Sequence, residues 1–170
     1  MARAFIGVGS NIDPGANIPQ ALRLLHRQLP IKAISTFYAT PAEGRPEQPD
    51  FFNGVAEVAI DLAPLALKDL LRGIEAQLGR VRTTDKYAPR TIDLDLLLYD
   101  DLVLNHTDLV LPDPLIERRA FLAVPLAELA LDLLLPGSRR RIAEIAADLG
   151  YNNLVILTDF TESLKKEIAR

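Results

Sequence analysis

The chain has 170 residues, of which 49% are hydrophobic and 25% are charged, a composition typical of one ordinary globular domain. It contains no cysteine, which excludes disulfide bridges and thiolate-bound metal sites. The formal net charge of −4 argues against a general nucleic-acid-binding protein, because such proteins normally present a strongly basic face.

The N-terminal third of the chain predicts one helix among three strands. Apolar residues recur at helical spacing from Ile18 to Leu29, and Pro30 ends that helix. A proline-rich loop, residues 41–50, precedes the third strand, in which Phe51 and Asn53 share the face opposite the apolar one. The expected strands are Ala4–Gly9, Ile31–Thr40 and Phe51–Leu62.

A second helix and a fourth strand follow. Leu67 to Leu78 carry the spacing of an amphipathic helix, which leads through a basic loop, residues 79–90, into a strand from Ile92 to Tyr99. The resulting order, βαββαβ, predicts an α+β fold with a ferredoxin-like core, in which helices pack on one face of an antiparallel sheet.

Further elements are expected after this core. The apolar stretch 120–135 is interrupted by a proline and two acids, unlike a membrane span, which needs about 20 apolar residues. We expect a single domain over residues 1–150 and an extension, residues 151–170, to which the sequence assigns no function. The added C-terminal elements are a hairpin within Val103–Val110, a helix Ile142–Leu149 ended by Gly150, a strand Leu154–Leu157 and a short helix from about Thr161.

Two carboxylates stand out in the fourth strand. Asp93 and Asp95 share one face, because side chains alternate along a strand, while Ile92, Leu94, Leu96 and Leu98 are expected on the other. Like charges at such positions repel, so the pair favours a bound cation or basic partners. Carboxylates together with water and substrate phosphates are the ligands that Mg²⁺ prefers. The alternative is a solvated edge strand that happens to carry acids.

The loop before this strand complements the acids. It contains Arg80, Arg82, Lys86 and Arg90. Cations donate charge-assisted hydrogen bonds to phosphate oxygens while a metal neutralises the remaining charge, as phosphoryl transfer requires. The alternative is an ordinary solvated loop.

Taken together, these segments resemble the 6-hydroxymethyl-7,8-dihydropterin pyrophosphokinase family of folate biosynthesis. The resemblance covers most of residues 1–150, and it rests on the order of the motifs rather than on any one of them. The motifs are Gly7–Asn11, Ser35–Pro41, Gln48–Asn53, Ile74–Glu75, Gly79–Arg82, Ala88–Asp95, Arg119–Phe121 and Pro125–Leu126.

The resemblance implies an ATP-dependent pyrophosphokinase. Such an enzyme transfers the pyrophosphoryl group of ATP to the hydroxymethyl oxygen of the reduced pterin and releases AMP. Two Mg²⁺ ions bound by Asp93 and Asp95 are implied, with ATP as co-substrate. The implied catalytic residues are Arg82, Arg90, Asp93 and Asp95; the ATP-binding residues Glu75, Arg82, Lys86, Arg90, Leu96, Asp113 and Arg119; and the pterin-binding residues Thr40, Pro41, Glu43, Phe51, Asn53 and Phe121.

The chain departs from the family at two places. Asp113 stands where the family commonly has a histidine between two prolines, and Tyr87-Ala88 replace a common Trp-Gly. An ionised Asp113 cannot donate a hydrogen bond to phosphate, so nucleotide affinity is the property most affected. Neither standard glycine-rich nucleotide motif is present, so the basic loop is expected to hold ATP and to close over both substrates.

Two other functions fit the same residues. One is a different Mg²⁺-dependent phosphotransferase that uses the Asp93/Asp95 pair, and the other is a catalytically inactive ferredoxin-like binding module. We expect a cytoplasmic protein, a monomer or weak homodimer, whose partners are small-molecule substrates rather than nucleic acid or membrane.

Overall fold

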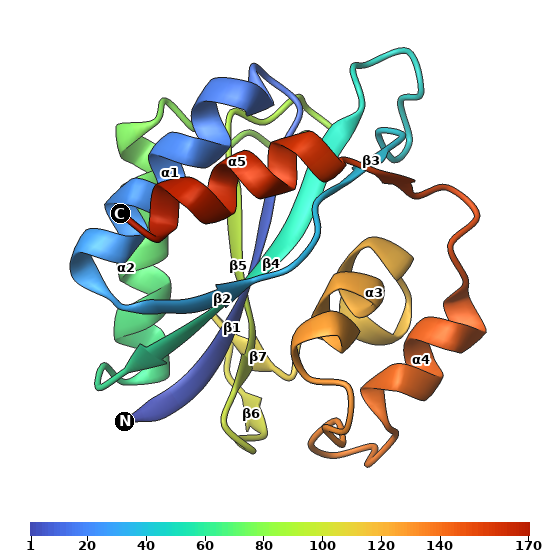
Figure 1. Ribbon diagram of the computed structural model, residues 1–170. Helices are drawn as coiled ribbons and strands as arrows, with labels where there is room; N and C mark the ends of the chain where they lie inside the picture. Colours follow the sequence, from blue (N-terminus) through green and yellow to red (C-terminus); the bar gives the residue numbers. More distant parts are fainter.

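A six-stranded antiparallel sheet organises the chain, and the computed structural model describes all residues from Met1 to Arg170 (Figure 1). The strands lie in the order β5-β1-β4-β3-β8, with β2 also paired to β4. The sheet strands are β1 (Ala2–Ser10), β2 (Ile31–Ile34), β3 (Tyr38–Thr40), β4 (Phe51–Ile60), β5 (Asp93–Tyr99) and β8 (Val155–Ile156). A separate small hairpin pairs β6 (Leu104–Asn105) with β7 (Val110–Leu111).

The helices cover both faces of this sheet (Figure 1). The two helices of the βαββαβ core, α1 and α2, pack on one face as predicted, and α5 lies beside α1. Of the added elements, α3 and α4 build a second apolar core on the other face. The helices are α1 (Pro14–Gln28), α2 (Pro64–Gln77), α3 (Ala120–Leu129), α4 (Ile142–Leu149) and α5 (Thr158–Ile168), with a 3₁₀ turn, η1 (Pro114–Glu117). The ferredoxin-like order is therefore confirmed.

The expected strand over residues 31–40 is divided into β2 and β3. The Thr36 N–H donates to the Glu128 carboxylate at 2.9 Å, and the Phe37 N–H donates to Thr161 Oγ1 at 2.8 Å. These side chains come from α3 and α5, so the N–H groups of Thr36 and Phe37 are satisfied outside the sheet.

The predicted face of Leu98 is wrong. The register between β1 and β5 shifts between Phe5 and Ile6, so Leu97 is inserted as an extra residue of β5. Leu98 then pairs with Phe5 and packs in the second core, while Leu94 and Leu96 stay in the first. Asp93 and Asp95 precede the bulge and keep their shared face.

The C-terminal extension packs into the first core. Its strand β8 pairs with β3, and Leu164 on α5 is fully buried. The Phe160 ring makes edge contacts with Phe37 and Phe52, with centroids 5.8 and 5.2 Å apart. None of the helices combines the length and apolar character that crossing a membrane demands.

We expect Leu164→Ala to lower the free energy of unfolding by about 2–5 kcal/mol, because it opens a cavity beneath α5. Chemical denaturation measures this change, with the exposed neighbour variant Lys165→Ala as the control. An unchanged denaturation midpoint for Leu164→Ala would show that α5 does not belong to the cooperative fold.

Candidate active site

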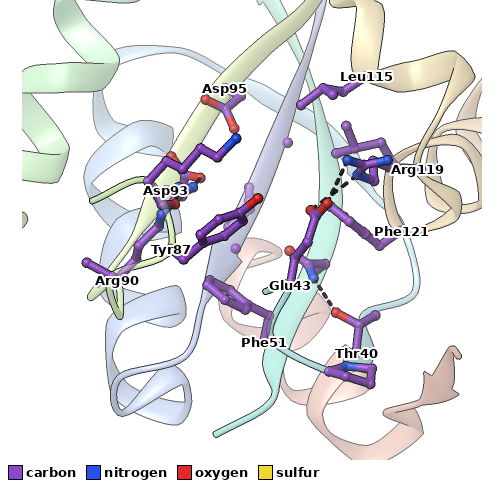
Figure 2. Close-up of a pocket in the computed structure, with 18 residues that line it drawn as sticks. Thr40, Glu43, Phe51, Tyr87, Arg90, Asp93, Asp95, Leu115, Arg119 and Phe121 are labelled. Atoms are coloured by element: carbon purple, nitrogen blue, oxygen red, sulfur yellow. Dashed lines mark hydrogen bonds and ion pairs between the residues drawn. The ribbon is translucent and has the colours of Figure 1, made fainter. Parts of the chain in front are cut away.

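A cavity of about 310 Å³ opens on the sheet face that carries Asp93 and Asp95 (Figure 2). Side chains from β4, β5, the start of α3 and two long loops line it. In Figure 2 the two aspartates lie at one end of the cavity and Thr40 at the other. Eleven of the predicted site residues meet there: Thr40, Pro41, Glu43, Phe51, Asn53, Lys86, Arg90, Asp93, Asp95, Arg119 and Phe121.

A second cavity, of about 280 Å³, adjoins the first and shares Asp95 with it. It contains Arg82, Leu96 and Asp113, three residues expected to bind the nucleotide. The remaining predicted residue, Glu75, lines neither cavity.

Gly9 in β1 leaves room for a functional side chain of the neighbouring strand β4. A Cβ atom at Gly9 would lie 2.6 Å from Oδ1 of Asn53, so only glycine permits the present position of that amide. The Asn53 Nδ2 donates to Thr40 Oγ1 at 2.9 Å. The amide of a nearly buried asparagine is thereby held at the end of the cavity away from the acids.

Asp93 and Asp95 lie near two further acids, Glu75 and Asp113. Enclosure within the concave site, followed by the charges of Asp93, Asp113 and Glu75, raises the pKa of Asp95 well above its ordinary value. Asp93 is paired with Arg90, whose Nη1 lies 2.5 Å from the carboxylate. Asp95 takes part in no ion pair, so its ionised form has no compensating partner of its own.

Glu75 connects α2, the basic loop and β5. It is 1% exposed; its Oε2 accepts the Leu94 N–H at 2.8 Å and its Oε1 accepts from Arg82 at 2.7 Å. Burial raises the pKa of Glu75, whereas the Leu94 N–H and Arg82 favour its ionised form. The geometry is that of a buried anchor that fixes Arg82 and the edge of β5.

The two long loops contact each other beside the first cavity. Gln48 Nε2 donates to the Tyr87 carbonyl at 2.8 Å, and Arg45 pairs with Asp85. Gly44, with φ of +75°, lies so close to Tyr87 that a Cβ atom would approach the ring to 2.9 Å. The Tyr87 ring therefore supplies a third contact between the two loops.

Arg119 is held across the cavity by Glu43 (Figure 2). Its Nη2 and Nε donate to the two carboxylate oxygens at 2.6 and 3.2 Å. This fork places a guanidinium group from the start of α3 over the ligand space.

A family model described as 7,8-dihydro-6-hydroxymethylpterin-pyrophosphokinase (HPPK) matches residues 5–131. The chain belongs to this family. Among its relatives is the 2-amino-4-hydroxy-6-hydroxymethyldihydropteridine pyrophosphokinase of Pseudomonas aeruginosa, 40% identical over 148 residues, which are 85% of this chain and 91% of the relative. The Haemophilus influenzae enzyme of the same name is 37% identical over 142 residues, 82% of this chain and 88% of the relative.

Solved structures of HPPK domains share the fold. A Plasmodium falciparum HPPK-DHPS triple mutant matches with a TM-score of 0.72 at 12% identity, over 86% of this chain and 43% of that one. The wild-type Plasmodium falciparum HPPK-DHPS matches with a TM-score of 0.71 at 12% identity, over 86% of this chain and 44% of that one. The chain therefore spans less than half the length of those proteins, and the likeness concerns the fold of their HPPK part.

Asp113, one of the two expected departures from the HPPK family pattern, has a structural partner. Its Oδ1 accepts the Leu115 N–H at 2.9 Å and so caps η1. Burial raises the pKa of Asp113, the Leu115 hydrogen bond opposes that shift, and the charge of Asp93 adds to it. The Asp113 side chain therefore stabilises the η1 turn, and it presents a carboxylate rather than a hydrogen-bond donor to the second cavity.

Arg80 is one of the four cations of the basic loop, but it was not among the site residues implied by the resemblance, and it lines neither cavity. Its Nε is buried without a hydrogen-bond partner. Burial lowers the pKa of the Arg80 guanidinium, and the nearby charge of Asp93 acts in the opposite direction. Its position in the basic loop was visible in the sequence, but its inward orientation depends on how that loop folds against β5.

Proposed function

We propose that the protein transfers the pyrophosphoryl group of ATP to the hydroxymethyl oxygen of 6-hydroxymethyl-7,8-dihydropterin in tetrahydrofolate biosynthesis. The substrate oxygen forms a bond to the β-phosphorus, the bridging bond between the α- and β-phosphates breaks, and AMP leaves. The hydroxyl proton is released. Membership of the HPPK family supports this reaction.

The observation that carries the proposal is that one cavity joins a charged end to a ring-binding end. Asp93, Asp95 and Arg90 line one part, and Phe51, Phe121 and Asn53 line another. An enzyme that binds an acceptor and a nucleotide in such adjacent sites converts a bimolecular reaction into an effectively unimolecular one.

The ring-binding end suits a flat heterocycle with hydrogen-bonding edges. The Phe51 and Phe121 rings supply apolar surface for the two faces of a pterin, and the Asn53 amide supplies its edge contacts. The Thr40 hydroxyl holds that amide in place, while Pro41 and Glu43 contribute the adjoining loop.

The charged end fits Mg²⁺. Asp93 and Asp95 are two carboxylates on one strand face, and no group of three His, Cys, Asp or Glu side chains stands ready to hold a metal ion. This set suits ions that complete their shell with water and phosphate oxygens, and we propose two of them. Bound Mg²⁺ would neutralise phosphate charge and polarise the acceptor hydroxyl.

The cations act on the phosphate oxygens. Lys86 and Arg90 from the basic loop, together with Arg119 from the start of α3, donate to the phosphates and stabilise the charge that develops during transfer. Arg82, fixed by Glu75, does the same from the second cavity.

The direct test is incubation with the reduced pterin, ATP and Mg²⁺, followed by chromatography of the nucleotides and pterins. We expect AMP and the pterin pyrophosphate in equal amounts, and no AMP when the pterin is omitted. ADP in place of AMP would indicate a different phosphotransferase, and substrate binding without nucleotide cleavage would indicate an inactive binding module.

We expect Asn53→Ala to raise the KM for the pterin about 10- to 100-fold, because the lost amide makes more than one hydrogen bond to the ring edge. Gly9→Ala should act in the same direction, since its Cβ displaces the Asn53 amide. Steady-state kinetics checks this, with Gly7→Ala as control because its Cβ meets only side-chain atoms at 3.4 Å or more. An unchanged pterin KM in both variants would remove Asn53 from the substrate site.

We expect Gly44→Ala to separate the two long loops, because its Cβ clashes with the Tyr87 ring. Trypsin should then cleave the basic loop faster, and ATP with pterin should protect it less than in the unaltered protein. Gly79→Ala controls for backbone strain alone, since Gly79 also has positive φ but open space around its Cβ position. Equal cleavage of both variants would contradict a role for the Gly44–Tyr87 contact.

A further inference from the structure

The second cavity lies where the edge of the sheet meets α2. Strand β5 ends the strand order on this side, and its residues Leu94 and Leu96 contribute apolar surface to the cavity. Asp95 belongs to both cavities, so a ligand bound to the metal-binding acids extends directly into the second. Under the proposed function, that ligand is ATP.

The two walls of this cavity carry opposite charge. Lys68 and Arg72 come from α2, and their spacing of four residues places them on the same helix face. Asp108 and Asp113 come from the hairpin and from the turn before η1. Acids at these two positions would repel a nucleoside triphosphate unless cations stood opposite them.

The side chains of Lys68 and Arg72 on α2 are unpaired in the structure. Neither Lys68 nor Arg72 takes part in an ion pair or a side-chain hydrogen bond, whereas Arg82 beside them is paired with Glu75. Lys68 is half-buried without such a partner. Partial burial and then the nearby Arg72 lower the pKa of the Lys68 ammonium, while Asp108 opposes that shift.

We propose that Lys68 and Arg72 bind the nucleotide by donating hydrogen bonds to oxygens of its ribose and phosphates in the second cavity. They supply the positive charge that Asp113 does not, and they offset Asp108. The inference rests on the proposed function, and it assigns to α2 a cationic wall beyond the basic loop.

The test is calorimetric titration with Mg²⁺ and α,β-methylene-ATP, which is not cleaved between its α- and β-phosphates. We expect the variant Lys68→Ala/Arg72→Ala to raise the Kd about 10- to 100-fold and to leave the pterin Kd within twofold. Alanine favours helix and both side chains project from the helix surface, so an unchanged thermal unfolding profile is expected. If the unfolding profile of the alanine variant changes, the titration is repeated with the variant Lys68→Gln/Arg72→Gln.

A matched control separates direct contact from net charge. Arg27→Ala/Lys32→Ala removes the same two charges from exposed positions outside both cavities and should change the Kd less than twofold. Asp108→Asn should tighten binding two- to fivefold, because it removes repulsion from the opposite wall.

The results separate this inference from the proposed function. An unaltered protein that forms AMP and pterin pyrophosphate, but whose Lys68/Arg72 variants keep the original Kd, would overturn the inference alone. Equal weakening by the control pair would also overturn it, since net charge would then explain the loss. Failure of the unaltered protein to bind the analogue would overturn the proposed function as well.

Discussion

Asp93→Ala and Asp95→Ala are each expected to lower kcat at least about 10³-fold while leaving pterin affinity within twofold. Metal-based charge neutralisation contributes several kcal/mol to a transition state, and each 1.36 kcal/mol is tenfold in rate. The aromatic and amide groups that hold the pterin lie elsewhere in the same cavity, so its binding should persist. Rapid-quench kinetics and pterin titration measure the two properties separately.

Asp95 is expected to lower the free energy of unfolding when neither metal nor substrate is bound. Asp95 has a raised pKa in the folded state, so the fold favours its protonated form; that stabilisation is present at low pH and is lost as pH rises through the raised pKa. Asp95→Asn should therefore be inactive yet more resistant to thermal unfolding at pH 8 in the absence of Mg²⁺. The control is Asp101→Asn, an exposed acid outside both cavities. Retained turnover in Asp95→Asn would contradict the metal assignment.

Arg90→Ala carries the second large expected effect, a loss of about 10²–10³ in kcat. The Arg90 backbone is fixed to the loop after β1, because its N–H donates to Asn11 Oδ1 at 2.8 Å and its carbonyl accepts from the Asn11 and Ile12 N–H groups. Its side chain reaches Asp93 and the Lys86 carbonyl. Such a preorganised cation stabilises charge that develops in the transition state, and removing one such donor typically costs this much in rate.

A substitution series distinguishes this role from simple substrate binding. Arg90→Lys keeps the charge but not the planar fork, so we expect activity between that of Arg90→Ala and that of the unaltered protein. Single-turnover rates at saturating ATP and pterin are the measurement. A normal rate with only the ATP KM raised would mean that Arg90 binds the ground state and the transition state equally.

Local sequence pattern predicted most of the fold, and the differences have non-local causes. The shared face of Asp93 and Asp95 follows from alternation alone, whereas the position of Leu98 depends on a bulge set by the pairing of β5 with β1. The split between β2 and β3 depends on Glu128 and Thr161, which are 92 and 124 residues away from their partners. No short-range pattern contains these contacts.

Helix α3 was not predicted for a different reason. Every residue from Leu122 to Ala127 is buried, so the segment lacks the one-sided apolar spacing that identifies a surface helix. Its burial against β4 and α4 is a property of the second core, which forms only when the C-terminal elements have folded back onto the sheet.

The candidate site was located mainly by the order of family motifs. Eleven of the residues implied by the resemblance line one cavity, and three more line the adjoining one. Lys68 and Arg72 could not be assigned in this way, because the role of a cation on a helix surface depends on the cavity that it faces. Gly9 belongs to the motif Gly7–Asn11, but the need for glycine at this position is explained only by the Asn53 side chain that lies beside it in the folded sheet.

The most direct test of the central claim is transfer of isotopic label from ATP labelled separately at its β- and γ-phosphates. Pyrophosphoryl transfer predicts that both labels enter the pterin product in equal amounts, matched by the AMP released. Entry of the γ-label alone, with ADP as the second product, would contradict attack at the β-phosphorus and the function proposed for this site.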